Sequence, residues 1–505
     1  MVMAGPDNRQ LVTVDLDLQN SKFIKYVAVI GGDSEDDECF RPTSPEHSVV
    51  LQYSTNGGMY WKTLHVLSYG SYTKPKGDYI VLPVEARTPN TRIRWYQSLA
   101  QDGSQKGPQW ALDNVYIGGS EINPSSISTN FDSIQGDQPW EFSPYGQIQS
   151  DVCTKGDKSM YWDSGSGVRS FTTGEMIIQY GYMLQFEIVV GCDRHVNACN
   201  HYPSVRLEYN KNPHSDQWNL LQPLCLPDHN RLMECQPNYY HSPSEYTPEG
   251  YPKWSLVTIE LPDKVFSGNT RFRWIQNATE REGSLWALNH IYAGEKCPDM
   301  CSGRGLCKDT ICQCLSGQGD SCRPVRNGMP RKMHETFEGG IYPRYWESIT
   351  GGGIGFGCGA LLPYAHGKTL YFNGCGIREA RTAELDLTRA LKIMFVLQIG
   401  CKQQTDSCNV KVGDGSYRGI LLQYTTNKGI EWKLLARHDP GHYLNPKRAA
   451  YDLPSDARVE GIQFRWYQTV HDGAGHDQWA IDSIEIIQNH NSFSSMSHRR
   501  KRRKA

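Results

Sequence analysis

The chain has 505 residues, which is too long for one ordinary domain core and indicates several domains. Lysine and arginine total 52, aspartate and glutamate total 54, and the net charge is −2. This balance excludes a nucleic-acid-binding protein, which would need a basic field for most of its affinity. No run of about eighteen apolar residues occurs, so we expect no membrane span.

Cysteine usage indicates an extracellular protein. The chain contains 16 cysteines, and a dense group lies between Cys297 and Cys322. Reduced cytosolic proteins seldom carry so many outside metal sites, so we predict a secreted protein with disulfide bonds. The triplet Asn277-Ala278-Thr279 is an acceptor sequon for N-glycosylation, in agreement with secretion. The opening MVMAGPDNRQ lacks the apolar core of a signal peptide, which favours a fragment or an incomplete gene model.

Two short motifs, Arg-x-Arg-Trp or Phe-Arg-Trp and then Trp-Ala-Leu/Ile-Asp/Asn, occur three times in the same order. The copies are TRIRWYQ at 91–97 with QWALDN at 109–114, TRFRWIQ at 270–276 with LWALNH at 285–290, and IQFRWYQ at 462–468 with QWAIDS at 478–483. The copies lie too far apart for a solenoid repeat. Their spacing is that of whole domains, so the sequence predicts three copies of one domain.

Two further blocks precede these motifs in every copy. In chain order they are VAVIGG at 27–32 and LQYSTNGGMYW at 51–61, FEIVVGC at 186–192 and LEYNKNPHSDQW at 207–218, and FVLQIGC at 395–401 and LQYTTNKGIEW at 422–432. Their β-branched and aromatic residues, punctuated by Gly, Asn and Pro, predict strands. STNGGMYW predicts a tight hairpin around its Asn-Gly pair. TRALKIM at 388–394 predicts at most a turn, so the fold class is all-β, a β-sandwich.

The cysteine-rich segment 297–322 separates the second and third copies. It is too short to bury a core and needs covalent staples. Its C-x-C pair, flanked by glycines, is typical of an EGF-like module, and that resemblance implies the pairs Cys297–Cys307, Cys301–Cys312 and Cys314–Cys322. The alternative is a zinc site made by Cys301, Cys307, Cys312 and Cys314.

These blocks divide the chain into five parts. They are a β-domain at 1–120, a β-domain at 121–294, an EGF-like module at 295–323, a β-domain at 330–488 and a basic tail at 489–505. Asp17 aligns with Asp386, but far fewer residues precede Asp17 within its domain. We therefore expect the first domain to be truncated at its start.

At this point the residues resemble the reelin repeat, in which two β-domains flank an EGF-like module and carry Asp-box-like hairpins. The segments that carry the resemblance are GGSEINPS at 118–125, IIQYGYMLQFEIVVGC at 177–192, LPYAHGKTLYFNGC at 362–375 and LTRALKIMFVLQIG at 387–400. The arrangement is similar to the C-terminal region of that family: the second half of the penultimate repeat, then the last repeat and a basic tail. It implies tandem jelly-roll subrepeats.

The resemblance also implies a function. Its members are secreted extracellular-matrix glycoproteins that regulate neuronal migration and positioning and cell adhesion by binding lipoprotein receptors of the low-density-lipoprotein-receptor family. The family's receptor-contacting lysines lie in central repeats that this chain lacks, so none is carried over. The family also binds calcium in its jelly-roll subrepeats.

The acidic position of the Trp-Ala motif is the candidate metal ligand. It is Asp113 in the first copy, Asn289 in the second and Asp482 in the third. Calcium prefers six to eight hard oxygens, and a second oxygen donor stands near the start of two domains. The predicted pairs are Asn289 with Asp132 and Asp482 with Glu338, with weaker binding at Asn289 because an amide brings no charge. The alternative is a capping or turn role.

Catalytic motifs are not evident, and we expect a protein that is not an enzyme. The alternative is a secreted hydrolase, since Asp-boxes also occur in sialidases and the reelin family has been attributed serine protease activity. A glycosidase needs paired carboxylates or a Tyr nucleophile with arginines, and no G-x-S-x-G elbow is present. His195, His290 and His366 adjoin no nucleophile motif. At His290 we expect a strand-end side chain, with zinc ligation as the alternative.

The basic tail contains Arg499, Arg500, Lys501 and Arg502. This block is typical of a proprotein-convertase site, and in a secreted chain it favours contact with heparan sulfate, an anionic membrane or an acidic co-receptor over a nuclear signal. The alternative is a solvated tail.

Disulfide connectivity outside the EGF-like module stays open in the sequence. Equal spacing suggests local pairs Cys192–Cys199 and Cys401–Cys408, and Cys225–Cys235 is compatible with a closed loop. Cys153 aligns with Cys358, whereas Cys375 has no counterpart in the second domain, and Cys39 lacks the local partner found in the other copies.

Overall fold

The computed structural model describes most of the chain. Residues outside the description are 4–8, 33–40, 74, 99–107, 119–122, 133–139, 141–142, 144, 164–166, 193–202, 213–216, 223–238, 241–243, 279–284, 356–366, 401–409, 411–416 and 489–505. The described part is built from antiparallel strands and short 3-10 turns, so the predicted all-β class is confirmed. Within it, no helix has the length and hydropathy needed to span a bilayer.

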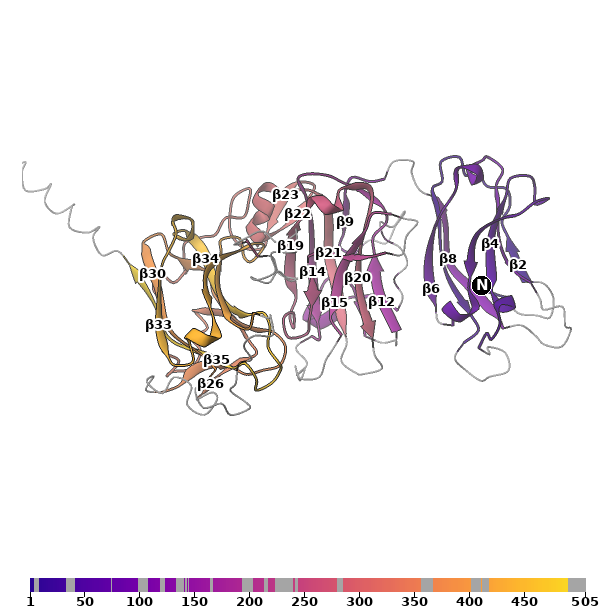
Figure 1. Ribbon diagram of the computed structural model, residues 1–505. Helices are drawn as coiled ribbons and strands as arrows, with labels where there is room; N and C mark the ends of the chain where they lie inside the picture. The colour runs from indigo at the N-terminus through magenta and orange to yellow at the C-terminus, as the bar shows by residue number, and fades with distance from the viewer. Residues whose placement is uncertain are drawn as a thin grey trace, which may run out of the picture.

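The first sandwich lies at the N-terminal end (Figure 1). Its strands are β1 (Val2–Met3), β2 (Arg9–Val12), β3 (Phe23–Ile30), β4 (Val49–Ser54), β5 (Lys62–Leu67), β6 (Lys76–Val81), β7 (Arg92–Gln97) and β8 (Trp110–Gly118). They form two four-stranded sheets, β1-β8-β3-β6 and β2-β7-β4-β5. The 3-10 turns are η1 (Pro45–His47), η2 (Tyr69–Ser71) and η3 (Val84–Ala86).

The second sandwich repeats this plan. Its strands are β9 (Ile127–Thr129), β10 (Gln147–Gln149), β11 (Ser159–Trp162), β12 (Gly167–Thr172), β13 (Met176–Ile178), β14 (Tyr182–Val190), β15 (Val205–Asn210), β16 (Asn219–Leu220), β17 (Tyr239–Tyr240), β18 (Glu245–Tyr246), β19 (Ser255–Glu260), β20 (Ser267–Ala278) and β21 (Trp286–Glu295), with turns η4 (Val152–Thr154) and η5 (Asp263–Val265). One sheet follows the order β10-β11-β21-β14-β19 and the other β12-β20-β15-β16.

The cysteine-rich segment, which we call the EGF-like module after its predicted resemblance, follows with turn η6 (Pro298–Gly303) and the hairpin of β22 (Gly305–Lys308) and β23 (Ile311–Cys314). The third sandwich contains β24 (His334–Glu335), β25 (Trp346–Thr350), β26 (Gly352–Gly355), β27 (Thr369–Phe372), β28 (Arg378–Thr382), β29 (Leu385–Asp386), β30 (Ala390–Ile399), β31 (Ile420–Thr425), β32 (Trp432–His438), β33 (Lys447–Asp452), β34 (Glu460–Gln468) and β35 (Trp479–Gln488), with turns η7 (Pro440–His442) and η8 (Ser455–Ala457). Its sheets follow the orders β26-β27-β35-β30-β33 and β17-β32-β31-β34-β28-β25.

Two kinds of sheet alternate along the molecule. We call the sheets that contain β8, β21 and β35, the strands of the Trp-Ala motif, bulge sheets. We call the sheets that contain β7, β20 and β34, the strands of the Arg-Trp motif, hairpin sheets. Figure 1 shows the six sheets stacked in one row, so that each inner hairpin sheet faces the bulge sheet of the preceding sandwich.

The tryptophans of both motifs form the cores. Trp95 and Trp110 lie in the first core, Trp274 and Trp286 in the second, and Trp466 and Trp479 in the third, all at most 1% exposed. One tryptophan comes from each sheet, so the pair joins the two layers of a sandwich. Truncating a buried tryptophan to alanine costs about 3–5 kcal/mol. The motifs recur because each copy needs this packing.

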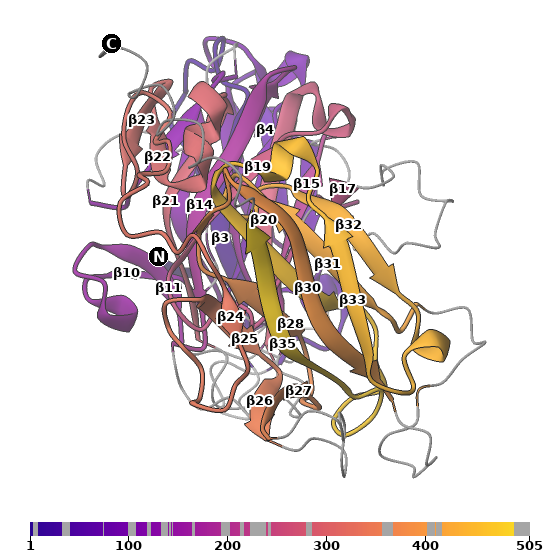
Figure 2. The ribbon, with the colours of Figure 1, turned by 90° about the vertical axis from the view of Figure 1, so that its left-hand side faces the viewer.

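One strand crosses between sandwiches. The short β17, which belongs to the second sandwich by sequence, pairs antiparallel with the edge strand β32 of the third (Figure 2). Tyr240 is opposite Trp432 in this register. The pairing satisfies backbone groups that an edge strand would otherwise expose, and it ties the two sandwiches together.

Candidate functional site

The acidic position of the Trp-Ala motif lies beside a β-bulge in all three sandwiches. The pairing register skips one residue opposite this position, between Lys25 and Val27, between Gln185 and Glu187, and between Met394 and Val396. The extra residue is Asn114, His290 or Ser483, with φ of 49°, 45° and 50°. Such left-handed backbone is costly for residues other than glycine, so each bulge needs local support.

The motif side chain supplies that support. The backbone N–H of the bulge residue donates to the side-chain oxygen of Asp113 at 2.9 Å, of Asn289 at 2.8 Å and of Asp482 at 2.6 Å. An aspartate or asparagine at this place therefore caps the bulge, and the threefold recurrence has a structural cause. The capping role leaves the second carboxylate oxygen of an aspartate for other partners.

The third bulge concentrates negative charge. Asp482 is 4% exposed, and burial together with repulsion from Glu338 and Glu335 raises its pKa to about 6, although the N–H of Ser483 opposes the shift. Glu335 is itself buried and accepts bonds from the Phe337 N–H at 3.0 Å and the Trp346 indole at 3.2 Å. Two neighbouring carboxylates therefore repel the charge of the buried Asp482, and a cation bound beside it would relieve this repulsion.

The Glu338 carboxylate lies against the backbone of residues 367 and 368. Its carboxylate accepts the Lys368 N–H at 3.1 Å and lies across Gly367, whose φ is 139°. A Cβ at residue 367 would fall 1.6 Å from the Glu338 oxygen, so only glycine allows the approach. The backbone of the 367–368 segment thus holds the predicted partner of Asp482 in position.

The second bulge is different. Asn289 is fully buried, and its amide nitrogen has no partner among the described residues. Asp132, its predicted partner, is exposed and accepts from the Asn130 amide at 2.6 Å. No bond joins Asn289 to Asp132 in the described part of the chain, so the proposed oxygen pair is not assembled there.

Positive charge occupies the second bulge instead. Glu187 lies opposite Asn289, and it accepts from the His290 ring at 2.6 Å and from the Lys155 ammonium. Burial alone would raise the pKa of Glu187, but the bonds from His290 and Lys155 outweigh it and lower the pKa. His290 thus bonds Glu187 from the middle of β21, where it is partly buried, and the predicted strand-end position is wrong.

The first bulge is open. Asp113 is exposed, and it caps Asn114 as described above. The three copies therefore present an exposed carboxylate, a buried amide beside an ion pair, and a buried carboxylate repelled by the buried Glu335 and the exposed Glu338.

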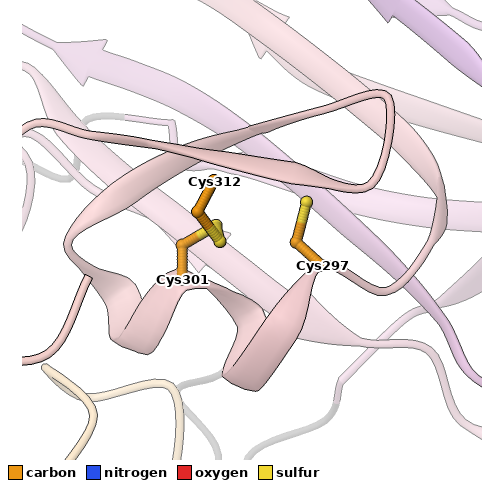
Figure 3. Close-up of side chains that lie close together, drawn as sticks. All are labelled: Cys297, Cys301 and Cys312. Atoms are coloured by element: carbon orange, nitrogen blue, oxygen red, sulfur yellow. A yellow bond between two sulfur atoms is a disulfide. The ribbon is translucent and has the colours of Figure 1, made fainter. Parts of the chain in front are cut away.

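The EGF-like module contains the three disulfides that its resemblance implies, Cys297–Cys307, Cys301–Cys312 and Cys314–Cys322. Within the described residues, Cys297, Cys301 and Cys312 are the only His, Cys, Asp or Glu side chains close enough in threes to hold a metal ion. Figure 3 shows the sulfurs of Cys301 and Cys312 bonded to each other. Zinc binds thiolates, and cysteines joined in disulfides offer none. The alternative of a zinc site made by these cysteines is therefore wrong.

The module bonds to both the second and the third sandwich. On one side, the Gln185 amide donates to Gly305 O at 3.1 Å and accepts the Cys307 N–H at 2.7 Å. On the other side, the buried Arg304 donates to Glu384 at 2.8 Å and to Gly461 O at 3.2 Å. These bonds to both neighbours restrict the angle between the second and third sandwiches.

The Asp-box-like hairpins use their polar groups on their own turns. Asn56 accepts the Tyr60 N–H at 3.0 Å and Ser54 accepts the Gly58 N–H at 2.9 Å. Asn427 and Thr425 make the same bonds in the third sandwich, at 3.1 and 3.0 Å. The predicted hairpin is confirmed, and its turn has φ of 92° at Gly58 and of 87° at the equivalent Gly429. The hairpins are therefore structural.

One disulfide differs from the local pair suggested by spacing. Cys192 bonds to Cys153, not to Cys199. The equal cysteine spacing in two copies comes from the repeat of the domain and does not predict the disulfide. Cys153 lies next to Cys192 only because the chain folds. Cys375 is also in a disulfide. Cys39, Cys199, Cys225, Cys235, Cys358, Cys401 and Cys408 lie outside the described residues, as do His195, His366 and the tail from Arg499 to Arg502.

A buried arginine, missed in the sequence, stands in each hairpin sheet. Arg9, Arg169 and Arg378 are at most 5% exposed, and each donates to the glutamine that ends the Arg-Trp motif, Gln97, Gln276 or Gln468. The feature of the sequence that could have indicated these arginines is the glutamine at the end of all three copies of the Arg-Trp motif. The Asn277 sequon follows the second of these glutamines and its side chain is exposed on β20.

Several solved structures are similar to the chain at low identity. The C-terminal CBM6 of LamC from Zobellia galactanivorans shares 11% identity, with 34% of this chain and 99% of that chain covered and a TM-score of 0.20. The tandem CBM51 modules of Sp3GH98 from Streptococcus pneumoniae share 12%, with 72% and 100% covered and a TM-score of 0.19. The K2 cleaved adhesin domain of Lys-gingipain shares 12%, with 33% and 98% covered and a TM-score of 0.21. Likenesses at this level carry no argument about function.

The family comparison is more specific. The family described as Reelin subrepeat B matches residues 1–118, 146–294 and 351–487. Each matched segment falls on one sandwich, and together they cover most of the chain. The match therefore repeats three times, as the Trp-Ala and Arg-Trp motifs do. The chain belongs to the reelin subrepeat B family.

Proposed function

We propose that the chain is a secreted, non-enzymatic signalling protein of the extracellular matrix, equivalent to the C-terminal region of a reelin-type protein. The observation that carries this proposal is the family match on all three sandwiches. Disulfides in the EGF-like module and in the second sandwich support an oxidising compartment. Regulation of neuronal migration and cell adhesion is the role that the family implies.

Absence of catalysis is part of the proposal. Polar side chains that recur among the sandwiches make structural bonds: Asn56 in a turn, Asp113 at a bulge and Arg378 in a core. A general acid or nucleophile needs a group that is available to substrate. A peptide or sialoside substrate that the purified chain turns over, with activity lost on one substitution, would favour the hydrolase instead.

Calcium is the proposed cofactor of the third sandwich. Asp482 and Glu338 would hold it, and bound calcium would supply the positive charge that this carboxylate cluster lacks. The second sandwich is proposed not to bind calcium at its bulge, because the Lys155 ammonium already balances Glu187 there and the His290 ring bonds the same carboxylate. Zinc is not proposed.

Calorimetry tests the calcium proposal. The secreted full chain should bind calcium, and Asp482→Ala should abolish the strongest binding event. Asp113→Ala is the matched control, because Asp113 holds the same place in the first sandwich but is exposed. Equal binding by the Asp482→Ala chain and the unaltered chain would refute the site.

The proposed partners are lipoprotein receptors of the low-density-lipoprotein-receptor family, with heparan sulfate or an acidic co-receptor at the tail. Surface plasmon resonance with receptor ectodomains and with heparin measures both. Replacement of Arg499, Arg500, Lys501 and Arg502 by alanine should weaken heparin binding and leave the receptor response unchanged. If neither surface responds to the unaltered chain, the partner assignment fails.

Secretion has its own test. Asn277 is exposed on β20, as an acceptor must be. Expression in mammalian cells behind a heterologous signal peptide should yield a glycosylated chain in the medium. Asn277→Gln should remove one glycan in a mass measurement. A chain that carries no glycan would contradict exposure of this sequon to the secretory pathway.

A further inference from the structure

A cavity of about 790 Å³ lies where the second sandwich meets the third. One wall is formed by β19 and by residues 245–253 before it, and the other by the hairpin sheet of the third sandwich through β25, β28 and β34. Figure 1 shows β19 and β34 on the facing sides of these two sandwiches. The volume falls in the range of about 300–1,000 Å³ that small-molecule sites occupy.

The walls of this cavity touch at two places on its border. A Cβ at Gly250 of the second sandwich would fall 2.9 Å from the side chain of Ile377 in the third. A Cβ at Gly303 of the EGF-like module would fall 2.6 Å from Asn427 O, in a hairpin of the third sandwich. Both glycines therefore bring backbone directly against the third sandwich, which sets the spacing of the walls.

The floor of the cavity on the third sandwich is a fixed polar network. Glu379 accepts from Arg381 at 3.1 Å and from Arg465 at 3.1 Å. Burial alone would raise the pKa of Glu379, but the two arginines outweigh it and lower that pKa, so the carboxyl stays ionised. Arg465 also donates to the Gln423 oxygen at 2.6 Å and lies 4.2 Å from the Trp432 ring. Arg381 is 26% exposed and lines the cavity, so its guanidinium is accessible to a ligand.

The charges around the cavity cancel. Among the described residues that line it, four are carboxylates and four are cations. They also pair locally, since Lys428 lies 3.9 Å from Glu347. Burial alone would lower the pKa of Arg381, but Glu379 and Glu347 raise it. A site without net charge favours a neutral ligand, because a charged one would lose its hydration without gaining a counter-charge.

Two tyrosines line the cavity from opposite walls, Tyr251 from the second sandwich and Tyr467 from β34. Neither hydroxyl makes a hydrogen bond within the described part of the chain. The ring of Tyr251 is held edge-on by Tyr246, with ring centres 5.0 Å apart. Burial raises the pKa of Tyr251 to about 12, and the charges that act most on it come from Arg381 and Glu379 on the facing wall. A phenol both donates and accepts, so each hydroxyl can bond a ligand hydroxyl.

The groups around the cavity match a neutral sugar better than other ligands. Each sugar hydroxyl donates and accepts, which suits phenols, a guanidinium and a carboxylate placed side by side. The C–H faces of a sugar ring are apolar and pack against flat aromatic side chains. An anionic group would find Arg381 and Arg465 already paired with Glu379. A purely apolar ligand would cover this polar network without bonding it, which costs free energy.

We propose that this cavity binds a neutral oligosaccharide, held by the hydroxyls of Tyr251 and Tyr467 and by the guanidinium of Arg381. The ligand contacts two sandwiches at once and therefore couples them. The two hydroxyls gain bonds only when the ligand is present, so they serve affinity and not folding. Asp482 does not line the cavity, so the calcium proposal and this one can fail independently.

A glycan array that carries neutral and acidic oligosaccharides tests the proposal with the secreted full chain. The chain should retain neutral oligosaccharides, and calorimetry with the one retained most strongly measures the affinity. Tyr251→Phe and Tyr467→Phe should each weaken this binding about fivefold or more and leave thermal unfolding unchanged, because each removes a hydroxyl without a partner in the free protein. Tyr180→Phe is the matched control, since Tyr180 is 86% exposed and does not line the cavity.

Hydrogen exchange locates the bound sugar. The oligosaccharide used in calorimetry should slow amide exchange in peptides of β19 on one wall and of β25 and β28 on the other. Retention of acidic oligosaccharides alone, or of none on the array, would overturn the proposal. Unchanged affinity in both phenylalanine variants, or protection confined to one wall or to the first sandwich, would overturn it as well. Earlier thermal unfolding of both variants would assign the hydroxyls a structural role and also count against it.

Discussion

The guanidinium of Arg378 donates to the side-chain oxygen of Gln468 at 2.9 Å, inside the third sandwich. The same guanidinium also reaches Gly374 O, Gly473 O and Asp477 O, all within 2.9 Å. Burial lowers the pKa of Arg378 to about 10, which still leaves it charged at neutral pH. One side chain therefore holds two loops, the one before β28 and the one between β34 and β35, against the end of β34.

Replacement of this arginine should destabilise the third sandwich. We expect Arg378→Met to cost about 3 kcal/mol, because several buried acceptors lose their donor at once. Hydrogen exchange of peptides from 346–488 measures the loss separately from the other two sandwiches. Arg448→Met is the control, since Arg448 is 66% exposed and should change stability by less than about 0.5 kcal/mol. Equal effects of the two substitutions would show that the loop contacts are unimportant.

Asp482→Asn should stabilise the calcium-free third sandwich at neutral pH. The folded pKa of Asp482, about 6, lies above the unfolded value, so the folded state binds more protons and loses stability as pH rises through 6. Asparagine can still accept the Ser483 N–H, as Asn289 accepts that of His290. The gain is at most about 3 kcal/mol at pH 7.

Hydrogen exchange without and with calcium checks this prediction. The variant should be more protected than the unaltered chain in the presence of a chelator, and added calcium should protect only the unaltered chain. A variant that is less stable than the unaltered chain in chelator would mean that the charge of Asp482 does not destabilise the folded state. The Asp113→Asn chain should behave like the unaltered one.

His438 should make the third sandwich sensitive to acid. Its ring donates from Nδ1 to Ile420 O at 3.0 Å and accepts at Nε2 from the Tyr451 hydroxyl at 2.9 Å, and burial lowers its pKa to about 4. The unfolded state binds a proton first as pH falls below about 6.5, so stability declines between pH 6.5 and 4.

His438→Gln should flatten this part of the pH profile. Between pH 6.5 and 4 the unaltered chain should lose at most about 3 kcal/mol more unfolding free energy than the variant. Denaturant unfolding in calcium-free buffers at half-unit pH steps measures it. His442→Gln is the control, because His442 is exposed on η7. If both variants keep the slope of the unaltered chain, its source lies in another group.

Arg304→Ala should uncouple the EGF-like module from the third sandwich. Arg304 is 2% exposed and joins the module to Glu384 and Gly461, so its loss leaves buried acceptors without a donor. Small-angle scattering should show a broader range of domain separations, while the three disulfides of the module remain formed. Arg323→Ala, on a side chain that is 77% exposed, should leave the scattering unchanged. A scattering profile unaffected by Arg304→Ala would place the rigidity elsewhere, in the β17–β32 pairing for example.

Local features of the fold were readable from residue order. The alternation of VVLQYS and ILLQYT predicts strands, and these became β4 and β31. The Asn-Gly hairpins needed only their own residues, because Asn56 and Ser54 bond backbone groups within the same turn. TRALKIM is a partial exception, since its turn ends at Arg389 and β30 begins at Ala390.

Contacts between distant segments were not readable in the same way. Cys192 bonds to Cys153 instead of its near neighbour in sequence. The partner of each motif glutamine is an arginine about 90–110 residues away, such as Arg169 for Gln276. The acidic position of QWALDN predicted an oxygen ligand, but its capping of a left-handed bulge residue needed the register of β8 against β3.

The sequence by itself determined three β-domains, one cysteine-stapled module and the tryptophans that fill each core, because strand alternation, turn residues and side-chain size act within a few residues. Tertiary structure alone decided that Asp482 lies among carboxylates while Asn289 lies beside an ion pair, although both residues occupy the same motif position. It also decided which hairpin sheet faces which bulge sheet (Figure 1). The electric field at a side chain and the neighbour of a sheet depend on segments that the chain brings together only when it folds.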